Sequence, residues 1–469
     1  MTETAAKPEK KAKLPLGTNY WKLWSASVVS NLGDGVAFIA YPWLASAVTR
    51  SPVLIAAIAV AQRLPWLIFS LPAGVITDRV DRRKIMVWAN VFRTALTAVV
   101  AAIVLWQTSS LPAPDEIGGS GEVTTNWIVY LTLLVSALLF GMAEVLYDNS
   151  AQTILPAMVE PEGLERANGN LWSAEMVANS FAGPPLGSLL IALMFALPFI
   201  FDAVTFAVAA VLLLTMAGSF MVERDQAQLG EKVDWRGEIK EGVRWLWNNE
   251  LLRMMAIVLG LLNGLTMMVF ATFVLFAQEV LEVNAFVFAI LGASAALGGV
   301  LGGLLSPRIS ERIGSGPSLT VTFVVGIVTT LIIGLTSNWV VAFVGFVAFT
   351  FSATLWNVVT VSLRQTIIPD ELLGRVNSVY RFFAWGMMPI GLALGGLIVA
   401  VTEAVSGSRE LALRMPWLVS AAGLLVVFIY AGPKLTTDAI ETARADGIAA
   451  KESSVNSLES PGSSEVAED

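Results

Sequence analysis

QTILP at residues 152–156 is repeated almost letter for letter as QTIIP at residues 365–369. A few residues after each copy stands a second matched pair, LERAN at 164–168 and LGRVN at 373–377. Two matched pairs that occur in the same order indicate an internal repeat. The sequence therefore predicts a chain built from two similar halves.

The repeat lies in a chain of 469 residues that is strongly apolar. Hydrophobic residues make up 55% of it and charged residues 14%, and the mean hydropathy is +0.70. A helix needs roughly 20 apolar residues to cross a bilayer, so about twelve crossings use nearly the whole length. We therefore predict an all-α membrane protein with two six-helix bundles. The apolar runs lie at 21–47, 52–76, 84–106, 127–150, 168–192, 197–219, 252–277, 285–306, 317–336, 339–362, 378–401 and 415–431.

The segments outside these runs set the expected domain boundaries. Residues 1–20 form a basic leader without the apolar core of a signal peptide, and the two bundles cover 21–219 and 252–431. Residues 220–251 read as a cytosolic linker with an amphipathic helix. Residues 432–469 are polar and acidic, and we expect them to be disordered.

The distribution of basic residues predicts the orientation in the membrane. Lysine and arginine near membrane ends stay on the cytoplasmic side. They gather in the leader, in the connection after the second run and in the linker, whereas the opposite side has only Arg50, Arg409 and Arg414. We expect a multi-pass protein of the cytoplasmic (inner) membrane with both termini in the cytosol and residues 107–126 outside.

The residue types that are missing exclude several functions. The chain has no cysteine and no histidine, which removes disulfides, thiolate chemistry, the commonest metal ligand and the usual neutral-pH acid/base. No nucleotide-binding loop is present, because the glycine series from Gly292 to Gly303 lacks a following Lys-Ser/Thr pair. We expect no enzyme activity, metal, cofactor or nucleic-acid partner. Any proton that the protein transfers must then bind to a carboxylate or a lysine.

The connection after the second apolar run carries a specific motif. Gly74 is followed four residues later by Asp78 and Arg79, and then by the basic pair Arg82 and Arg83. This pattern resembles the signature between helices 2 and 3 of the major facilitator superfamily. The resemblance implies the fold of that superfamily and a gating role for these residues. Asp81 stands where the family pattern has a second glycine.

Further motifs resemble one subgroup of this superfamily. Gly183, Pro184 and Gly187 match the core of the antiporter signature in the fifth helix, although the upstream glycines are Asn170 and Asn179 here. NLGDG at 31–35, FDA at 201–203 and GVRWL at 242–246 look like the drug and siderophore exporters related to macrolide efflux proteins and the enterobactin exporter. The similarity covers roughly residues 20–430 and implies proton-coupled export.

Ionisable residues inside the apolar runs are candidates for proton coupling. A charge at the bilayer centre costs about 2.5 to 3.5 kcal/mol on insertion scales, so such residues face a cavity or a partner. Asp34 is the only carboxylate deep in the first run. We expect Arg63 in the second run to balance its charge, and Arg93 in the third run is the alternative. A purely structural ion pair is the competing interpretation. Glu144 and Glu175 are the next candidates, and Asp202 reads as a helix cap.

A second set of residues predicts the substrate surface. Aromatic, amide, thioether and charged groups that share helical faces suit an amphiphilic substrate, since ring faces tolerate varied shapes while one polar contact orients them. Interhelical or lipid packing is the competing interpretation for any single tryptophan or methionine. The candidates are Asn31, Phe38, Trp172, Asn179, Asn263, Trp356, Asn357, Arg381, Trp385 and Met388.

The preferred interpretation is a monomeric secondary transporter that exports small organic molecules in exchange for protons. Its two bundles are expected to alternate access to a site near the middle of the membrane. An importer or facilitator on the same fold is the alternative, because sequence does not determine the direction of flux. A lipid-handling or signalling membrane protein is a further alternative from another class.

Overall fold

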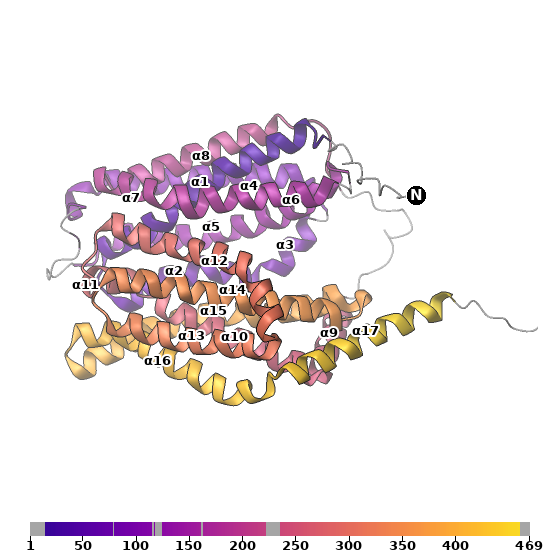
Figure 1. Ribbon diagram of the computed structural model, residues 1–469. Helices are drawn as coiled ribbons and strands as arrows, with labels where there is room; N and C mark the ends of the chain where they lie inside the picture. The colour runs from indigo at the N-terminus through magenta and orange to yellow at the C-terminus, as the bar shows by residue number, and fades with distance from the viewer. Residues whose placement is uncertain are drawn as a thin grey trace, which may run out of the picture.

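The chain folds into two helical bundles that lie side by side (Figure 1). The computed structural model describes residues 15–77, 79–114, 117, 124–160, 163–221 and 235–459. Within these ranges every regular element is helical, as the apolar runs predict. The indigo-to-magenta bundle is the N-terminal half, and the orange-to-yellow bundle is the C-terminal half.

In the part of the chain that the structure describes, the N-terminal bundle contains six crossings, two of which are built from more than one helix. Residue Pro65 lies inside the second crossing, which is interrupted at Phe69. A π-helix, η4 (Met176–Ala182), interrupts the fifth crossing. The helices of this bundle are α1 (Thr18–Val48), α2 (Pro52–Ile68), α3 (Ser70–Thr77), α4 (Arg82–Trp106), α5 (Trp127–Ile154), α6 (Leu164–Glu175), α7 (Gly183–Leu193) and α8 (Leu197–Leu214).

The C-terminal bundle repeats the pattern of six crossings after the helix α9 (Trp235–Asn248). The first crossing of this bundle, which is the seventh of the chain, is also divided into two helices, α10 (Glu250–Phe270) and α11 (Phe273–Glu279). The remaining helices are α12 (Ala285–Ile313), α13 (Ser315–Leu335), α14 (Trp339–Ile367), α15 (Asp370–Ser406), α16 (Arg409–Ala431) and α17 (Thr437–Glu459).

Among the described residues, eleven helical segments are long and apolar enough to cross a membrane, and α2 is a shorter apolar helix. Several of them start with a polar residue whose side chain accepts a hydrogen bond from the first turn. Such caps satisfy backbone N–H groups that have no partner inside the helix. The capping residues are Asn126 in α5, Asn249 in α10, Asn284 in α12, Asn338 in α14 and Ser408 in α16.

The segment after α16 differs from the expectation of disorder. Residues 437–459 form α17, which packs against α13 and α14. Ile440 is fully buried in this contact, and Ser315 donates a hydrogen bond to Glu441 at 2.9 Å. The polar composition concealed a helix that docks through a few apolar and small residues. Residues 460–469 lie outside the described part of the chain.

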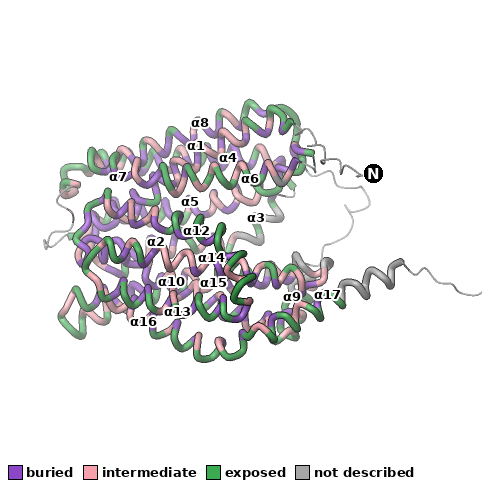
Figure 2. Tube along the Cα trace, in the orientation of Figure 1, coloured by how far each residue is buried: buried purple, intermediate pink, exposed green. Residues whose placement is uncertain are grey.

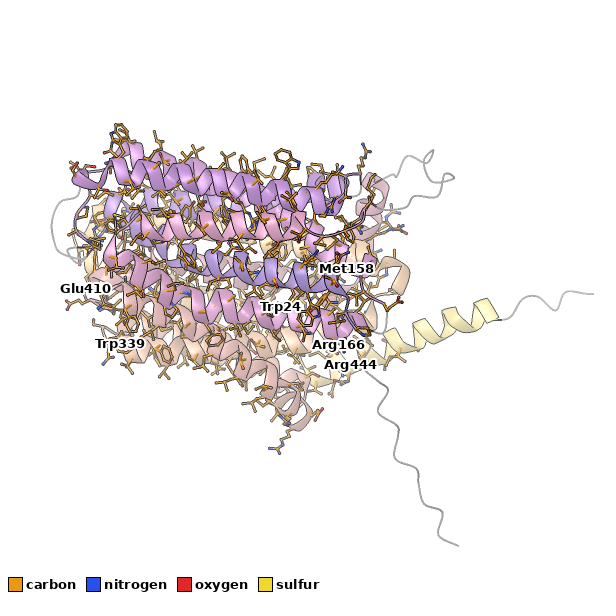
Figure 3. All side chains as sticks on the ribbon, turned by 90° about the horizontal axis from the view of Figure 1, so that it is seen from above. Trp24, Met158, Arg166, Trp339, Glu410 and Arg444 are labelled. Atoms are coloured by element: carbon orange, nitrogen blue, oxygen red, sulfur yellow. The ribbon has the colours of Figure 1, made fainter. Side chains whose placement is uncertain are left out.

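The molecule has two distinguishable ends, which Figure 3 labels by residue. Glu410 and Trp339 lie at one end, and Met158, Arg166 and Arg444 lie at the other. We call these the Glu410 end and the Arg444 end. Helix α17 and the described start of the chain are both at the Arg444 end.

Buried apolar residues join the bundles at the Glu410 end. One cluster there combines Ile39 and Trp43 of α1 with Phe276 of α11 and Trp417 of α16. At the Arg444 end the buried residues instead form two clusters, one within each half. Figure 2 shows buried segments running through both bundles, with exposed positions on their outer faces. The shared core therefore holds the halves together at one end.

Candidate functional site

The candidate site is a set of charged residues inside the N-terminal bundle. Asp34 lies about midway along α1 and is half-buried. It is within electrostatic range of Arg93 on α4, Glu144 on α5 and Glu175 at the end of α6. Four helices thus bring together one cation and three carboxyl groups, and ionisable residues at membrane depth are candidates for a functional site.

Arg93 is the cation of this cluster, in place of the predicted Arg63. Its side chain is 1% exposed, and its guanidinium lies 4.9 Å from the ring centre of Phe140, 5.1 Å from that of Tyr147 and 5.2 Å from that of Phe206. Its Nε and Nη2 atoms have no hydrogen-bond partner. Arg93 is therefore held by aromatic faces, with donor groups that remain free to bind a carboxylate.

Arg63 is exposed on α2, so the expectation that it balances Asp34 is wrong. Helix α2 packs mainly on α5 and α15, whereas α1 packs mainly on α8 and α7. Helical spacing places a residue on a face of its own helix, but it does not tell which neighbour that face meets. Arg93, the alternative counter-charge that the sequence predicted, lies within electrostatic range of Asp34.

Asp148 joins the cluster, although the sequence reasoning missed it. It is half-buried on α5 and interacts electrostatically with Glu144, Arg93 and Asp34. The signal was present, because Asp148 follows Glu144 by four residues and such pairs share a helical face. Glu175 is exposed at the junction of α6 and η4 and interacts with Glu144.

Two predicted asparagines meet beside Asp34. The Asn179 side chain donates to Asn31 Oδ1 at 3.5 Å, and Asn31 in turn donates to the carbonyl of Ser27 at 2.9 Å. Asn179 belongs to the π-helix η4, a form that often occurs at functional sites. A Cβ atom on Gly35 would overlap the Asn179 backbone, so glycine at position 35 allows α1 and η4 to approach.

The glycines of the antiporter motif serve the same close approach. A Cβ atom at Gly183 would stand 2.5 Å from Cα of Gly35, and one at Gly187 would stand 2.7 Å from the carbonyl oxygen of Val36. Pro184 is buried between them. The motif therefore lets α7 pack directly on the stretch of α1 that carries Asp34.

Aromatic residues connect the two bundles. The Phe38 ring on α1 is 55% exposed and lies against Gly292 of α12. Trp385 on α15 meets Trp66 on α2 edge to face, with ring centres 5.4 Å apart. Arg381 lies over the Trp385 ring at 5.4 Å. These contacts give a surface with ring faces and one cation between the halves.

Other predicted substrate residues are accessible but separate from these contacts. Trp172 on α6 is 64% exposed, Asn357 on α14 is exposed, and Met388 on α15 is half-buried. Among the described residues, an apolar cavity of about 650 Å³ lies elsewhere, between α7 and α12. Its lining includes Leu186 and Phe286 and none of the predicted substrate residues.

Trp356 and Asp202 depart from their expected roles, whereas the expected substrate contact of Asn263, which is half-buried, stays a prediction. Trp356 is 2% exposed and packs edge to face on Phe323 inside the C-terminal bundle, so it belongs to the core. Asn263 donates to the carbonyl of Ala384 at 2.8 Å and thereby ties α10 to α15. Asp202 does not cap α8, because the helix starts at Leu197 and Asp202 lies inside it.

The structure describes four of the five residues of the predicted gating motif. Asp78 lies outside the described residues. Gly74 lies in α3, and Arg79 is exposed after that helix. Arg82 donates to the carbonyl of Thr153 at 2.7 Å, and Arg83 donates to the carbonyl of Met216. The basic pair thus ties the start of α4 to the ends of α5 and α8.

Polar contacts join the bundles at the Glu410 end. Arg409 of α16 pairs with Glu279 of α11 at 2.9 Å and donates to the carbonyl of Arg50 at 2.9 Å. Arg50 donates to Gln278 at 2.5 Å, and Gln278 donates to Ser46 of α1 at 2.8 Å. We call these five residues the Arg409 network. It crosses between the halves where the shared apolar core does.

Two bundles of apolar helices, a charged cluster inside one of them and an aromatic surface between them define a multi-pass membrane transporter. The profile of the Major Facilitator Superfamily matches residues 23–392. The chain belongs to this family, which confirms the resemblance of its motifs.

Curated relatives and solved structures agree with this assignment. The chain is 27% identical to the multidrug efflux pump Tap of Mycolicibacterium fortuitum, over 86% of this chain and 94% of that protein. It is 25% identical to macrolide efflux protein A of Streptococcus pyogenes, over 81% and 90%. A bacterial homologue of the human lysosomal transporter Spinster, inward-facing and unoccupied, superposes with a TM-score of 0.67 at 14% identity, covering 91% of this chain and 98% of that one. The structural likeness confirms the fold.

Proposed function

We propose that the chain exports small organic molecules, of the drug or siderophore class, across the cytoplasmic membrane in exchange for protons. The observation that carries this proposal is the position of Asp34, half-buried midway along α1 beside Arg93, Glu144 and Glu175. A carboxyl group at such depth is costly unless it serves a partner or an ion. With histidine absent from the chain, carboxyl groups are the natural proton carriers.

Export of organic molecules is supported by the relatives, which are named for multidrug and macrolide efflux. The surface between the bundles suits the same class of substrate. Phe38, Trp66 and Trp385 offer ring faces, and Arg381 supplies one charge that orients an amphiphile.

The transporter works as a monomer by alternating access, with both termini in the cytosol and the Glu410 end outside. The contacts of the Arg409 network that cross between the halves, together with the shared apolar core, support a closed outer end in this conformation. Substrate then enters from the Arg444 end. A proton that reaches Asp34 from outside, after the bundles rock, displaces the substrate and returns with the carrier to the cytosolic side.

The test is Asp34→Asn in everted membrane vesicles with an acidic lumen. Asparagine keeps the shape of the side chain but cannot release a proton. We expect substrate binding to persist, while uptake driven by the pH gradient falls to the level of vesicles without the protein. Trp88→Phe, at a position on α4 that is 71% exposed, serves as a control for expression and insertion.

Gradient-driven uptake at the wild-type rate by folded Asp34→Asn protein would exclude Asp34 as the carrier. Loss of substrate from everted vesicles in place of uptake would show that the chain is an importer.

A further inference from the structure

Asp202 is a buried carboxyl group without a hydrogen-bond partner. It lies within α8 and is 0% exposed, and neither Oδ1 nor Oδ2 has a partner. The neighbouring Thr205 hydroxyl donates to the Asp202 backbone carbonyl at 2.8 Å and not to its side chain. Buried polar groups in proteins are nearly always paired, so this carboxyl group requires an explanation.

The contact with α1 places Asp202 beside the candidate site. A Cβ atom on Gly33 would overlap Asp202 Oδ1 and Thr205 Oγ1. Glycine at position 33 therefore lets α8 bring its carboxyl group against the turn of α1 that also carries Asp34. Asp202 and Asp34 are within electrostatic range of each other.

The charged and titratable groups around Asp202 come from three helices. Asp34 and Tyr41 face it from α1, and Arg93 faces it from α4. On α5, Tyr147 and Asp148 interact in turn with Arg93 and Asp34. The Tyr41 hydroxyl lies 3.4 Å from Ser136, to which it donates, so it is not the missing donor for Asp202.

An ionised carboxylate in this position would lack every hydrogen bond that compensates a charge for the loss of water. Arg93 does not supply such a bond here, because its Nε and Nη2 atoms are also without partners. The neutral acid avoids this cost. Its single O–H and its two oxygens still carry polar character, but no net charge is buried.

We propose that Asp202 binds a proton of its own, in addition to the one carried by Asp34, and releases it when Arg93 moves into contact. This proposal deepens the proposed function, on which it rests. In the release step the O–H bond of the Asp202 carboxyl group breaks, and the proton passes to water. The electron pair remains on the carboxylate, which the free N–H groups of the Arg93 guanidinium then stabilise.

Infrared difference spectroscopy on purified full-length protein tests this directly. The protein is prepared in nanodiscs with aspartate labelled by ¹³C at the carboxyl carbon, so that bands of protonated aspartate shift. Asp34→Asn/Asp148→Asn protein removes the other aspartates of the cluster. We expect a protonated aspartate band to persist in it at neutral pH and to disappear when Asp202→Asn is added. Arg93→Gln should retain the band at alkaline pH, where protein with Arg93 loses it.

Several outcomes would overturn the proposal. One is the absence of a protonated aspartate band from Asp34→Asn/Asp148→Asn protein, and another is its persistence after Asp202→Asn. Unfolding of the single variant Asp202→Asn would also contradict it, because exchanging a neutral acid for a neutral amide leaves Arg93 as it was. An unchanged alkaline loss of the band in Arg93→Gln would exclude the release step. The band is measured without transport, so it is independent of whether the chain exchanges substrate for protons.

Discussion

At the scale of single residues, Asp81 stands where the family motif has a glycine, and its carboxylate binds the start of α4. It caps α4 by accepting from the Lys84 N–H at 3.3 Å, and it accepts from Ser219 and the Phe220 N–H at 3.1 Å each. Burial raises the pKa of Asp81, but the hydrogen bonds from Phe220, Lys84 and Ser219 outweigh it and lower the pKa below its usual value. The carboxylate form therefore stabilises the folded protein.

The sign of this pKa shift predicts how stability depends on pH. Stabilisation by Asp81 is fully present above the unfolded value of about 3.9 and is lost as the pH falls through the lower folded value. We expect Asp81→Ala to reduce the unfolding free energy by roughly 1 to 2 kcal/mol at neutral pH, as for other helix caps. Thermal unfolding of the purified protein measures this.

Asp81→Asn is the matched control, since it keeps an acceptor oxygen but cannot titrate. Its stability relative to wild type should improve at acidic pH. A difference between wild type and Asp81→Ala that stays the same at pH 7 and at pH 3 would contradict the assignment.

At the scale of helices, the glycines of α12 determine how closely it packs on α14. A Cβ atom at Gly298 would overlap the carbonyl of Val347 and stand 3.0 Å from Thr350 Cβ, whereas one at Gly299 would meet nothing within 4 Å. Small residues allow such contacts between membrane helices. We expect Gly298→Ala to lower stability by roughly 1 to 3 kcal/mol through overpacking.

Gly299→Ala is the control in the same turn and should be neutral or stabilising by up to about 1 kcal/mol, as alanine favours helix. Unfolding of both variants in detergent compares them. Equal destabilisation by the two substitutions would mean that the α12–α14 contact does not depend on the missing side chain.

The same scale explains what the sequence could predict. Apolar runs are a local property of the sequence, so the membrane crossings and the two-half repeat were predictable. The counter-charge of Asp34 was not predictable from the sequence, because it depends on which helices can approach α1. Gly33, Gly35 and Gly183 allow that approach. For the same reason Asp202 looked like a cap and Trp356 like a substrate contact, although both are buried.

At the scale of the whole molecule, the Arg409 network predicts which end opens. If Glu279 holds the halves together there, Glu279→Gln should weaken its ion pair with Arg50 of the N-terminal half, at 3.6 Å, and shift the population towards conformations open at the Glu410 end. The absence of cysteine from the chain permits nitroxide labels at Val53 and Val405, which are 44% and 83% exposed. Electron–electron double resonance should then report longer distances than in labelled wild type.

Glu410→Gln is the matched control, because Glu410 pairs with Arg414 within α16 and not across the bundles. It should leave the distance distribution unchanged. Identical distributions in all three proteins would mean that the network does not contribute to closure.

The central claim is that substrate and protons move in opposite directions through one carrier. Its most direct measurement is the luminal pH of everted vesicles that contain the protein and hold an acidic lumen, followed by a pH-sensitive dye while a transported drug is added outside. We expect drug uptake to make the lumen more alkaline, at a rate that rises with drug concentration and vanishes in Asp34→Asn. Drug uptake at an undiminished rate with no change in luminal pH, or with the gradient already collapsed, would contradict it.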